Sequence, residues 1–285
     1  MKYVPLKHKY LFLIFLLISC SISSLTLSDT VTSWKEIDRY YKKNKINIFD
    51  LQESQMDKLK IYESLPEDFV SLDDVKKKKE IFFLVSYPMI YKTNKNIKME
   101  RQRIKDIEKK FKNKTISEKE IKELEELANK YKLDTGPLNR ILFKKLFQRI
   151  NVIPISLALG QAIIESGWGQ SRFAIEGNAL YGQWTYDQQQ GLVPEDRDAD
   201  KTHAVKKFKR LEDSVISYMF NINTHPAYYD FRVVRRLTSA LRLTSTAVNY
   251  KIQYLAAYAE IGQKYVDQLE LILETNSLKK FDKFN

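Results

Sequence analysis

The sequence predicts a mainly α-helical protein, long enough at 285 residues for one large or two small domains. Only 8 residues are glycine, which disfavours an all-β fold rich in tight turns. Apolar residues recur at helical spacing along most of the chain. Residues 155–164 are almost all apolar or small, so they predict a helix that is buried on most sides.

Residues 1–20 have the pattern of an export signal. Lysines precede an apolar run at 11–18 that is too short to span a bilayer comfortably. The run ends in Leu-Ile-Ser-Cys at 17–20, which resembles a bacterial lipoprotein cleavage box and predicts a lipid on Cys20. A plain secretory signal or an uncleaved anchor is the alternative. Cys20 is the single cysteine, so no internal disulfide is expected. Residues 21–33, rich in Ser and Thr, are predicted to be a tether.

An N-terminal helical region is predicted over residues 34–136. The apolar stretch 81–91 is broken by Pro88 and predicts a kinked, buried helix, since its length does not suit a membrane span. Ser117 and Glu120 form a capping box that begins a further helix. Gly136-Pro137 marks the boundary to the next domain.

A second domain is predicted over residues 137–276. Its first helix is amphipathic. The residues that define this pattern are Leu138, Ile141, Leu142, Lys145, Leu146, Arg149 and Ile150. The helical pattern stops between residues 181 and 208, where a small β-lobe or long loop is expected. Helices resume near Asp213-Ser214 as cap residues, and continue at 231–237 and 249–276.

Glu165 lies at the carboxyl end of the buried helix. Pro154 suits the first helical position, and Gly167 can end the helix in a left-handed conformation. The negative end of the helix dipole and the apolar surroundings both disfavour an ionised carboxylate. They predict a raised pKa for Glu165, as a general acid requires. The alternative is a structural ion pair between Glu165 and Arg172.

The residues around Glu165 resemble a known family. The segments 165–174 (Glu-Ser-Gly-Trp-Gly-Gln-Ser-Arg-Phe-Ala) and 177–182 (Gly-Asn-Ala-Leu-Tyr-Gly) are similar to the glucosaminidase domain of glycoside hydrolase family 73, in its bacterial Bax-type branch. Further similarity lies at 191–194, 202–208, 223–228 and 258–260, and more weakly at 65–103. The chain departs from the family at Ala179, where a second asparagine is usual.

This resemblance implies a lysozyme-like catalytic domain and an endo-β-N-acetylglucosaminidase that cleaves the β-1,4 bond after N-acetylglucosamine in peptidoglycan. It makes Glu165 the general acid and Glu195 the candidate second carboxylate, with a solvated acidic loop as the alternative for Glu195. Other acids of the expected lobe are Asp187, Asp196, Asp198 and Asp200. Tyr258 matches the family's cleft tyrosine, although a core position is equally compatible. Assistance by the substrate's own acetamido group also remains open.

Three further residues are predicted to contact the glycan. Aromatic faces suit sugar rings, which makes Tyr181 and Trp184 candidates, with core packing as the alternative. Asn178 is expected either to fix its loop by hydrogen bonds or to touch the ligand. No metal or cofactor is expected, because the histidines have no neighbouring ligands and no phosphate-binding glycine loop is present.

The net charge of +12 permits binding to nucleic acid. The export signal instead predicts a location on the periplasmic side of the bacterial cell envelope. The expected partners there are peptidoglycan strands and a membrane, to which the lipid on Cys20 would anchor the protein. The oligomeric state is left open. Two alternative functions remain at this stage. They are a lytic transglycosylase-like enzyme and an inactive glycan-binding envelope lipoprotein.

Overall fold

The computed structural model describes residues 29–134, 136–185, 187, 189, 191–194, 203–240, 251–259 and 262–284. It confirms a mainly α-helical protein with a small three-stranded sheet and an N-terminal helical region. The α-helices are α1 (Trp34–Lys43), α2 (Val75–Lys112), α3 (Glu118–Lys130), α4 (Arg140–Arg149), α5 (Ile155–Ser166), α6 (Arg172–Gly177), α7 (Leu211–Thr224), α8 (Tyr229–Ala240) and α10 (Gln263–Thr275). The 3₁₀ helices include η4 (Pro226–Tyr228), η5 (Gln253–Tyr258) and η6 (Leu278–Phe284).

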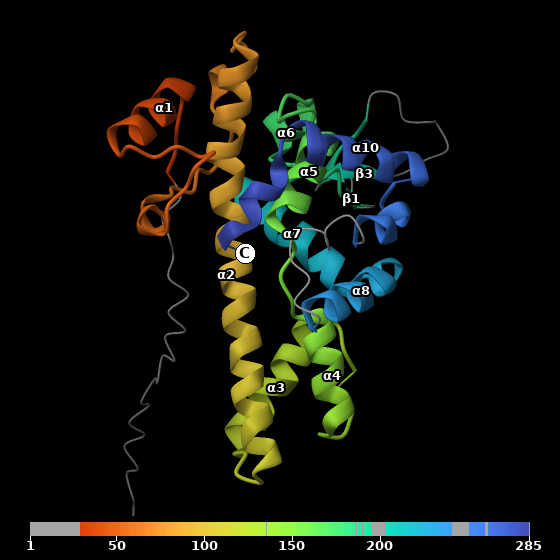
Figure 1. The fold of residues 1–285 in the computed structure, drawn as a ribbon. Helices are drawn as coiled ribbons and strands as arrows, with labels where there is room; N and C mark the ends of the chain where they lie inside the picture. Colours follow the sequence, from red (N-terminus) through yellow and green to blue (C-terminus); the bar gives the residue numbers. More distant parts are fainter. Residues whose placement is uncertain are drawn as a thin grey trace, which may run out of the picture.

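Helix α2 is the longest element and runs along one side of the molecule (Figure 1). It contains the whole stretch 81–91 and continues through Pro88, which has no N–H to donate to the carbonyl of Leu84. The hydroxyl of Tyr41 in α1 donates to this carbonyl at 3.3 Å and replaces the missing bond. Within the described residues, no helix has the length and apolar character that crossing a membrane requires.

Helix α5 lies at the centre of the fold and packs against α2, α10 and η6. It begins after Pro154, which is the N-cap and not the first helical residue. Ser156 donates from its backbone N (2.9 Å) and its Oγ (2.6 Å) to the Asp282 carboxylate, so η6 caps the start of the helix. As predicted, α5 ends at Gly167, whose φ of 56° lies in the left-handed region.

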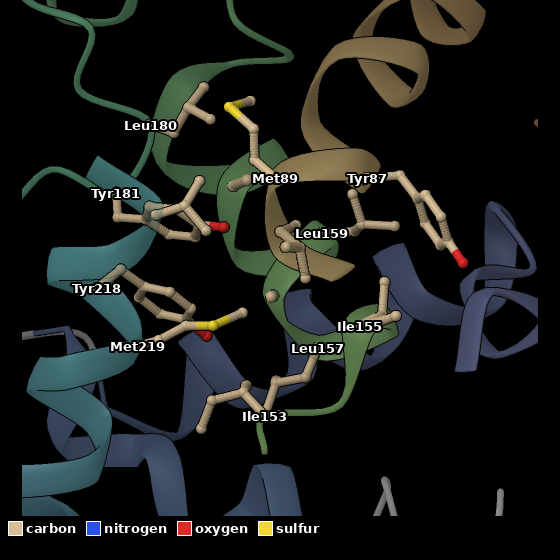
Figure 2. Close-up of a cluster of buried hydrophobic side chains, with 14 of the residues drawn as sticks. Tyr87, Met89, Ile153, Ile155, Leu157, Leu159, Leu180, Tyr181, Tyr218 and Met219 are labelled. Carbon is tan, nitrogen blue, oxygen red and sulfur yellow. The ribbon is translucent and has the colours of Figure 1, made fainter. Parts of the chain in front are cut away.

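One hydrophobic cluster extends from Val31 to Phe281 and joins α1 and α2 to the helices around α5. Figure 2 shows part of this cluster, with Leu157 and Leu159 of α5 between side chains of α2 and α7. The rings of Tyr181 and Tyr218 stack at a centroid distance of 3.8 Å.

The small sheet follows the loop after α6. Its strands are β1 (Trp184–Thr185), β2 (Gly191–Leu192) and β3 (Ala204–Lys206), in the antiparallel order β1-β3-β2. Trp184 is paired with Val205, and Leu192 is paired with Val205 from the other side. The predicted lobe between residues 181 and 208 therefore contains a sheet, with Val205 in its central strand.

Several local predictions were wrong. Ile141 is 62% exposed, and Phe143 fills the core in its place, because the face of α4 is rotated relative to the expected stripe. Helix α7 begins at Leu211, earlier than expected, because Arg210 is the N-cap and Asp213 completes the capping box from the third position. Within the described part of the expected helix at 249–276, η5 and α10 are separate elements, since Ala259 after η5 is extended and Gly262 before α10 has a φ of 56°.

Candidate active site

Glu165 lies in the last turn of α5, two residues before Gly167 ends the helix. Its side chain is partly buried. The loop after α6 passes directly beside it, since a Cβ added to Gly182 would lie 3.0 Å from Glu165 Oε2. Gly182 also has a φ of 54°, so a side chain at this position would be strained as well as close to the carboxylate. A bare backbone therefore borders the candidate acid.

Burial raises the pKa of Glu165 from 4.5 to about 7, although a hydrogen bond from the Tyr265 hydroxyl lowers it. Desolvation penalises the charged carboxylate, and the hydrogen bond favours it, but desolvation is the larger effect. The raised pKa agrees with the sequence prediction, and the apolar surroundings are its main cause. About half of the Glu165 side chains would carry a proton at neutral pH.

A chain of hydrogen bonds holds Tyr265 against Glu165. Tyr218 of α7 donates to Oε1 of Gln161 at 2.6 Å, and Nε2 of Gln161 donates to the Tyr265 hydroxyl oxygen at 2.8 Å. Because Gln161 occupies one acceptor position of that oxygen, the Tyr265 proton is directed to Glu165. Gln161 is fully buried and precedes Glu165 by one helical turn. We name Tyr218, Gln161 and Tyr265 the relay.

Sequence reasoning missed this relay. Its members come from three helices, and Gln161 and Tyr265 are separated by 104 positions. One signal was available, because Gln161 is a polar residue inside an otherwise apolar helix. A buried amide needs hydrogen-bond partners, and those partners mark a polar network.

Tyr258 lies next to the relay. Its ring stacks on Tyr265 at a centroid distance of 5.4 Å and an interplanar angle of 17°. Its hydroxyl donates to the backbone carbonyl of Tyr181 at 3.2 Å. The ring of Tyr228 in η4 lies 6.0 Å from that of Tyr258, measured between centroids. Burial is the main cause that raises the pKa of Tyr228 to about 12, and the nearby Glu165 charge is the second cause. Both tyrosines thus remain neutral around the acid.

The Tyr181 side chain lies in the core and not on the surface. It is 2% exposed and stacks on Tyr218, so its ring has no free face for a sugar. The prediction that Tyr181 is a sugar platform is therefore not supported by its position. Its backbone carbonyl still contributes to the site, because it accepts the hydrogen bond of Tyr258.

Asn178 ends α6 in a left-handed conformation with a φ of 51°. Its Nδ2 donates to the backbone carbonyls of Phe208 and Lys209, each at 3.3 Å. These bonds correspond to the loop-fixing role, which was one of the two expected from the sequence. They tie the loop that carries Gly182 to the segment that follows β3.

Trp184 is 57% exposed, and its ring stacks on His203 at 4.2 Å and 17°. It follows Gly182 by two residues, and two extended residues span at most about 7 Å. The backbone of Trp184 therefore lies within about 7 Å of Gly182, which borders the Glu165 carboxyl. Of the two aromatic residues predicted to contact glycan, Trp184 is the one with surface available for stacking.

The alternative partner of Glu165 takes part in other contacts. Arg172 donates to the Val193 carbonyl at 2.7 Å and lies 3.7 Å from the Glu176 carboxylate. Trp168 packs between Phe82 and Phe83 of α2, with ring centroids 5.6 Å from each. It joins the end of α5 to the N-terminal region as a partly buried residue packed against the core.

The candidate second carboxylate, Glu195, lies outside the described residues, as do Asp196, Asp198 and Asp200. Asp187 is exposed and accepts a hydrogen bond from the Gln189 backbone at 3.0 Å, which stabilises a local turn. Within the described ranges, no cluster of three or more His, Cys, Asp or Glu residues could hold a metal ion.

Two comparisons with known proteins found a match. The profile of the glucosaminidase family, described as mannosyl-glycoprotein endo-β-N-acetylglucosaminidase, matches residues 141–278. The chain is 30% identical over 215 residues to Protein bax of Escherichia coli (strain K12), covering 72% of this chain and 74% of that protein. No solved structure matches the chain.

Proposed function

Because the chain belongs to the glucosaminidase family of glycoside hydrolases, in its Bax-type branch, we propose that it is an endo-β-N-acetylglucosaminidase of peptidoglycan. In this proposal it hydrolyses the β-1,4 bond after N-acetylglucosamine, with Glu165 as the general acid. The single observation that carries the proposal is the position of Glu165, partly buried at the carboxyl end of α5 beside the bare backbone of Gly182, where burial raises its pKa. The export signal and the family resemblance together favour a cell-wall glycan as the substrate.

In the first step, protonated Glu165 donates its proton to the glycosidic oxygen as the bond to the anomeric carbon breaks. The leaving sugar then departs as an alcohol, and Glu165 becomes a carboxylate. The Tyr265 hydroxyl donates to this carboxylate and stabilises it after the proton has left. The relay thus holds the acid in one orientation during both protonation states.

The positive charge that develops on the sugar ring needs a second group. Glu195 in the lobe is our candidate, either as nucleophile or as the base that activates water. The alternative is attack by the substrate's own acetamido oxygen, with Tyr258 orienting that group from its position beside Tyr265. For substrate binding, we propose that a sugar ring stacks on the exposed face of Trp184.

Mass spectrometry of muropeptides after incubation with the purified protein tests this function. We expect fragments with a reducing N-acetylglucosamine end. Fragments with an anhydro end would instead identify a lytic transglycosylase, which needs a single acid. Intact glycan strands that nevertheless bind the protein would support an inactive glycan-binding protein.

We also propose that the mature protein begins at Cys20 and is held at a membrane of the bacterial cell envelope by a lipid on this residue. The cleavage box at 17–20 and the apolar run before it support this proposal; residues 1–28 lie outside the described part of the chain. Intact-mass analysis of the native protein should show a lipid adduct on Cys20. A mass that starts elsewhere, or lacks the adduct, would refute it.

A further inference from the structure

A pocket of about 200 Å³ lies between the segment after α3, helix α4 and the start of α8. Figure 1 shows α4 and α8 side by side below α5. The pocket shares no lining residue with the Glu165 site. The two are adjacent through η4, because Tyr228 contacts Tyr258 whereas its neighbour Tyr229 lines the pocket.

The lining of this pocket is strongly cationic. Lys132, Lys145, Arg149 and Arg232 line it, and Asp134 is the one carboxylate among its described lining residues. Burial lowers the pKa of Arg232 to about 10, with the Arg149 charge as the next cause. Lys132 and Lys145 are exposed to solvent, so the repulsion matters most between buried Arg232 and Arg149, where an anion or water would compensate for it.

Two of the lining residues, Arg232 and Gln148, each also have one buried donor atom with no acceptor within the described part of the chain. Arg232 is 2% exposed, and its Nε has no hydrogen-bond partner, although its Nη1 donates to the carbonyls of Ile222 (3.0 Å) and His225 (2.8 Å). Nε2 of Gln148 likewise has no partner. Because an unsatisfied buried donor costs about 1–3 kcal/mol, such groups indicate a missing water or ion.

We infer that this pocket binds a compact oxyanion, either a carboxylate or a phosphate group. Arginine and amide N–H groups are the usual donors to both, and the excess of positive charge selects an anion over water. The volume exceeds the roughly 30 Å³ that one water occupies in the liquid, which leaves room for an anion with accompanying waters. Binding at this pocket does not require the proposed hydrolase activity.

Calorimetry of the full chain tests the inference. The protein is titrated with inorganic phosphate and, in a separate experiment, with acetate. The ionic strength is held constant, with chloride as the reference salt. We expect saturable binding of at least one of the two anions, and the comparison identifies which one. In a parallel ¹⁵N NMR titration, the Nε signal of Arg232 should shift with the same dissociation constant.

Two neighbouring lysines on α4 provide matched variants, since both are exposed but Lys145 lines the pocket and Lys144 does not. Lys145→Gln should weaken binding about two- to fivefold, as expected for loss of one exposed charge, whereas Lys144→Gln should leave it unchanged. Arg232→Lys, which removes the Nε donor, should weaken binding about tenfold or more if melting shows that it folds. Equal weakening by both lysine variants, the absence of saturable binding, or an unmoved Arg232 signal would overturn the inference.

Discussion

Replacing Glu165 by glutamine should stabilise the protein at high pH and have little effect at low pH. The pKa of this carboxyl is 4.5 without burial and about 7 in the fold, a difference of about 2.5 units. Each pKa unit corresponds to about 1.36 kcal/mol, so ionising the buried group costs about 3 kcal/mol of folding free energy.

The sign follows from the direction of the shift. The folded state binds the Glu165 proton more tightly than the unfolded state, so this contribution to stability is complete below pH 4.5. It is lost as the pH rises from 4.5 through 7. Glutamine has the same shape and never ionises. The stability of Glu165→Gln minus that of the wild type should therefore rise from near zero at pH 4 to about 3 kcal/mol at pH 8.

Urea unfolding of both proteins at several pH values measures this difference in unfolding free energy. Subtracting the wild-type value from that of the variant cancels the contributions of the other titrating groups. Glu176→Gln is the matched control, because Glu176 is 54% exposed and its salt bridge to Arg172 is long at 3.7 Å. We expect no more than a few tenths of a kcal/mol of pH dependence for this control. A difference that is constant with pH, or a wild type that becomes relatively more stable at pH 8, would refute the reasoning. The second result would indicate an ion pair at Glu165.

Three further predictions concern the surroundings of the acid. Tyr265→Phe removes the hydrogen bond that lowers the pKa of Glu165, so the basic limb of the pH–rate profile should move up by about one unit. Tyr218→Phe keeps the Tyr265 hydroxyl and should therefore move the limb by less. Trp184→Ala should raise KM about two- to tenfold in steady-state assays with soluble glycan and leave the melting temperature unchanged, since the indole is 57% exposed. If Glu195 is the second carboxylate, Glu195→Gln should reduce turnover at least about 100-fold with an unchanged melting curve; nearly full turnover would favour the acetamido-assisted route.

The features of the site that depend on local sequence were predictable. The end of α5, the left-handed Gly167 and the raised pKa of Glu165 all follow from one short stretch of chain, because caps and helix burial are local properties. The capping box at Ser117 was predictable for the same reason, and the structure confirms it.

The features that depend on contacts between distant segments were not predictable. Tyr181 and Tyr258 are both tyrosines in largely apolar segments. Tyr181 nevertheless stacks on Tyr218 in the core, whereas Tyr258 stacks on Tyr265 beside the acid. Hydrophobic periodicity cannot distinguish these environments, because both are largely buried. The same limit explains Ile141, since a stripe that fits helical spacing does not reveal which face of α4 its neighbours cover.

The most direct test of the central claim compares the rate of peptidoglycan cleavage by the wild type and by Glu165→Gln at pH 6, where most Glu165 carboxyls carry a proton. General acid catalysis typically contributes about 10²–10⁴-fold, and glutamine cannot donate a proton to the leaving oxygen. We predict a loss of at least that size in a variant that folds normally. A rate for Glu165→Gln close to that of the wild type would contradict the assignment of Glu165 as the general acid.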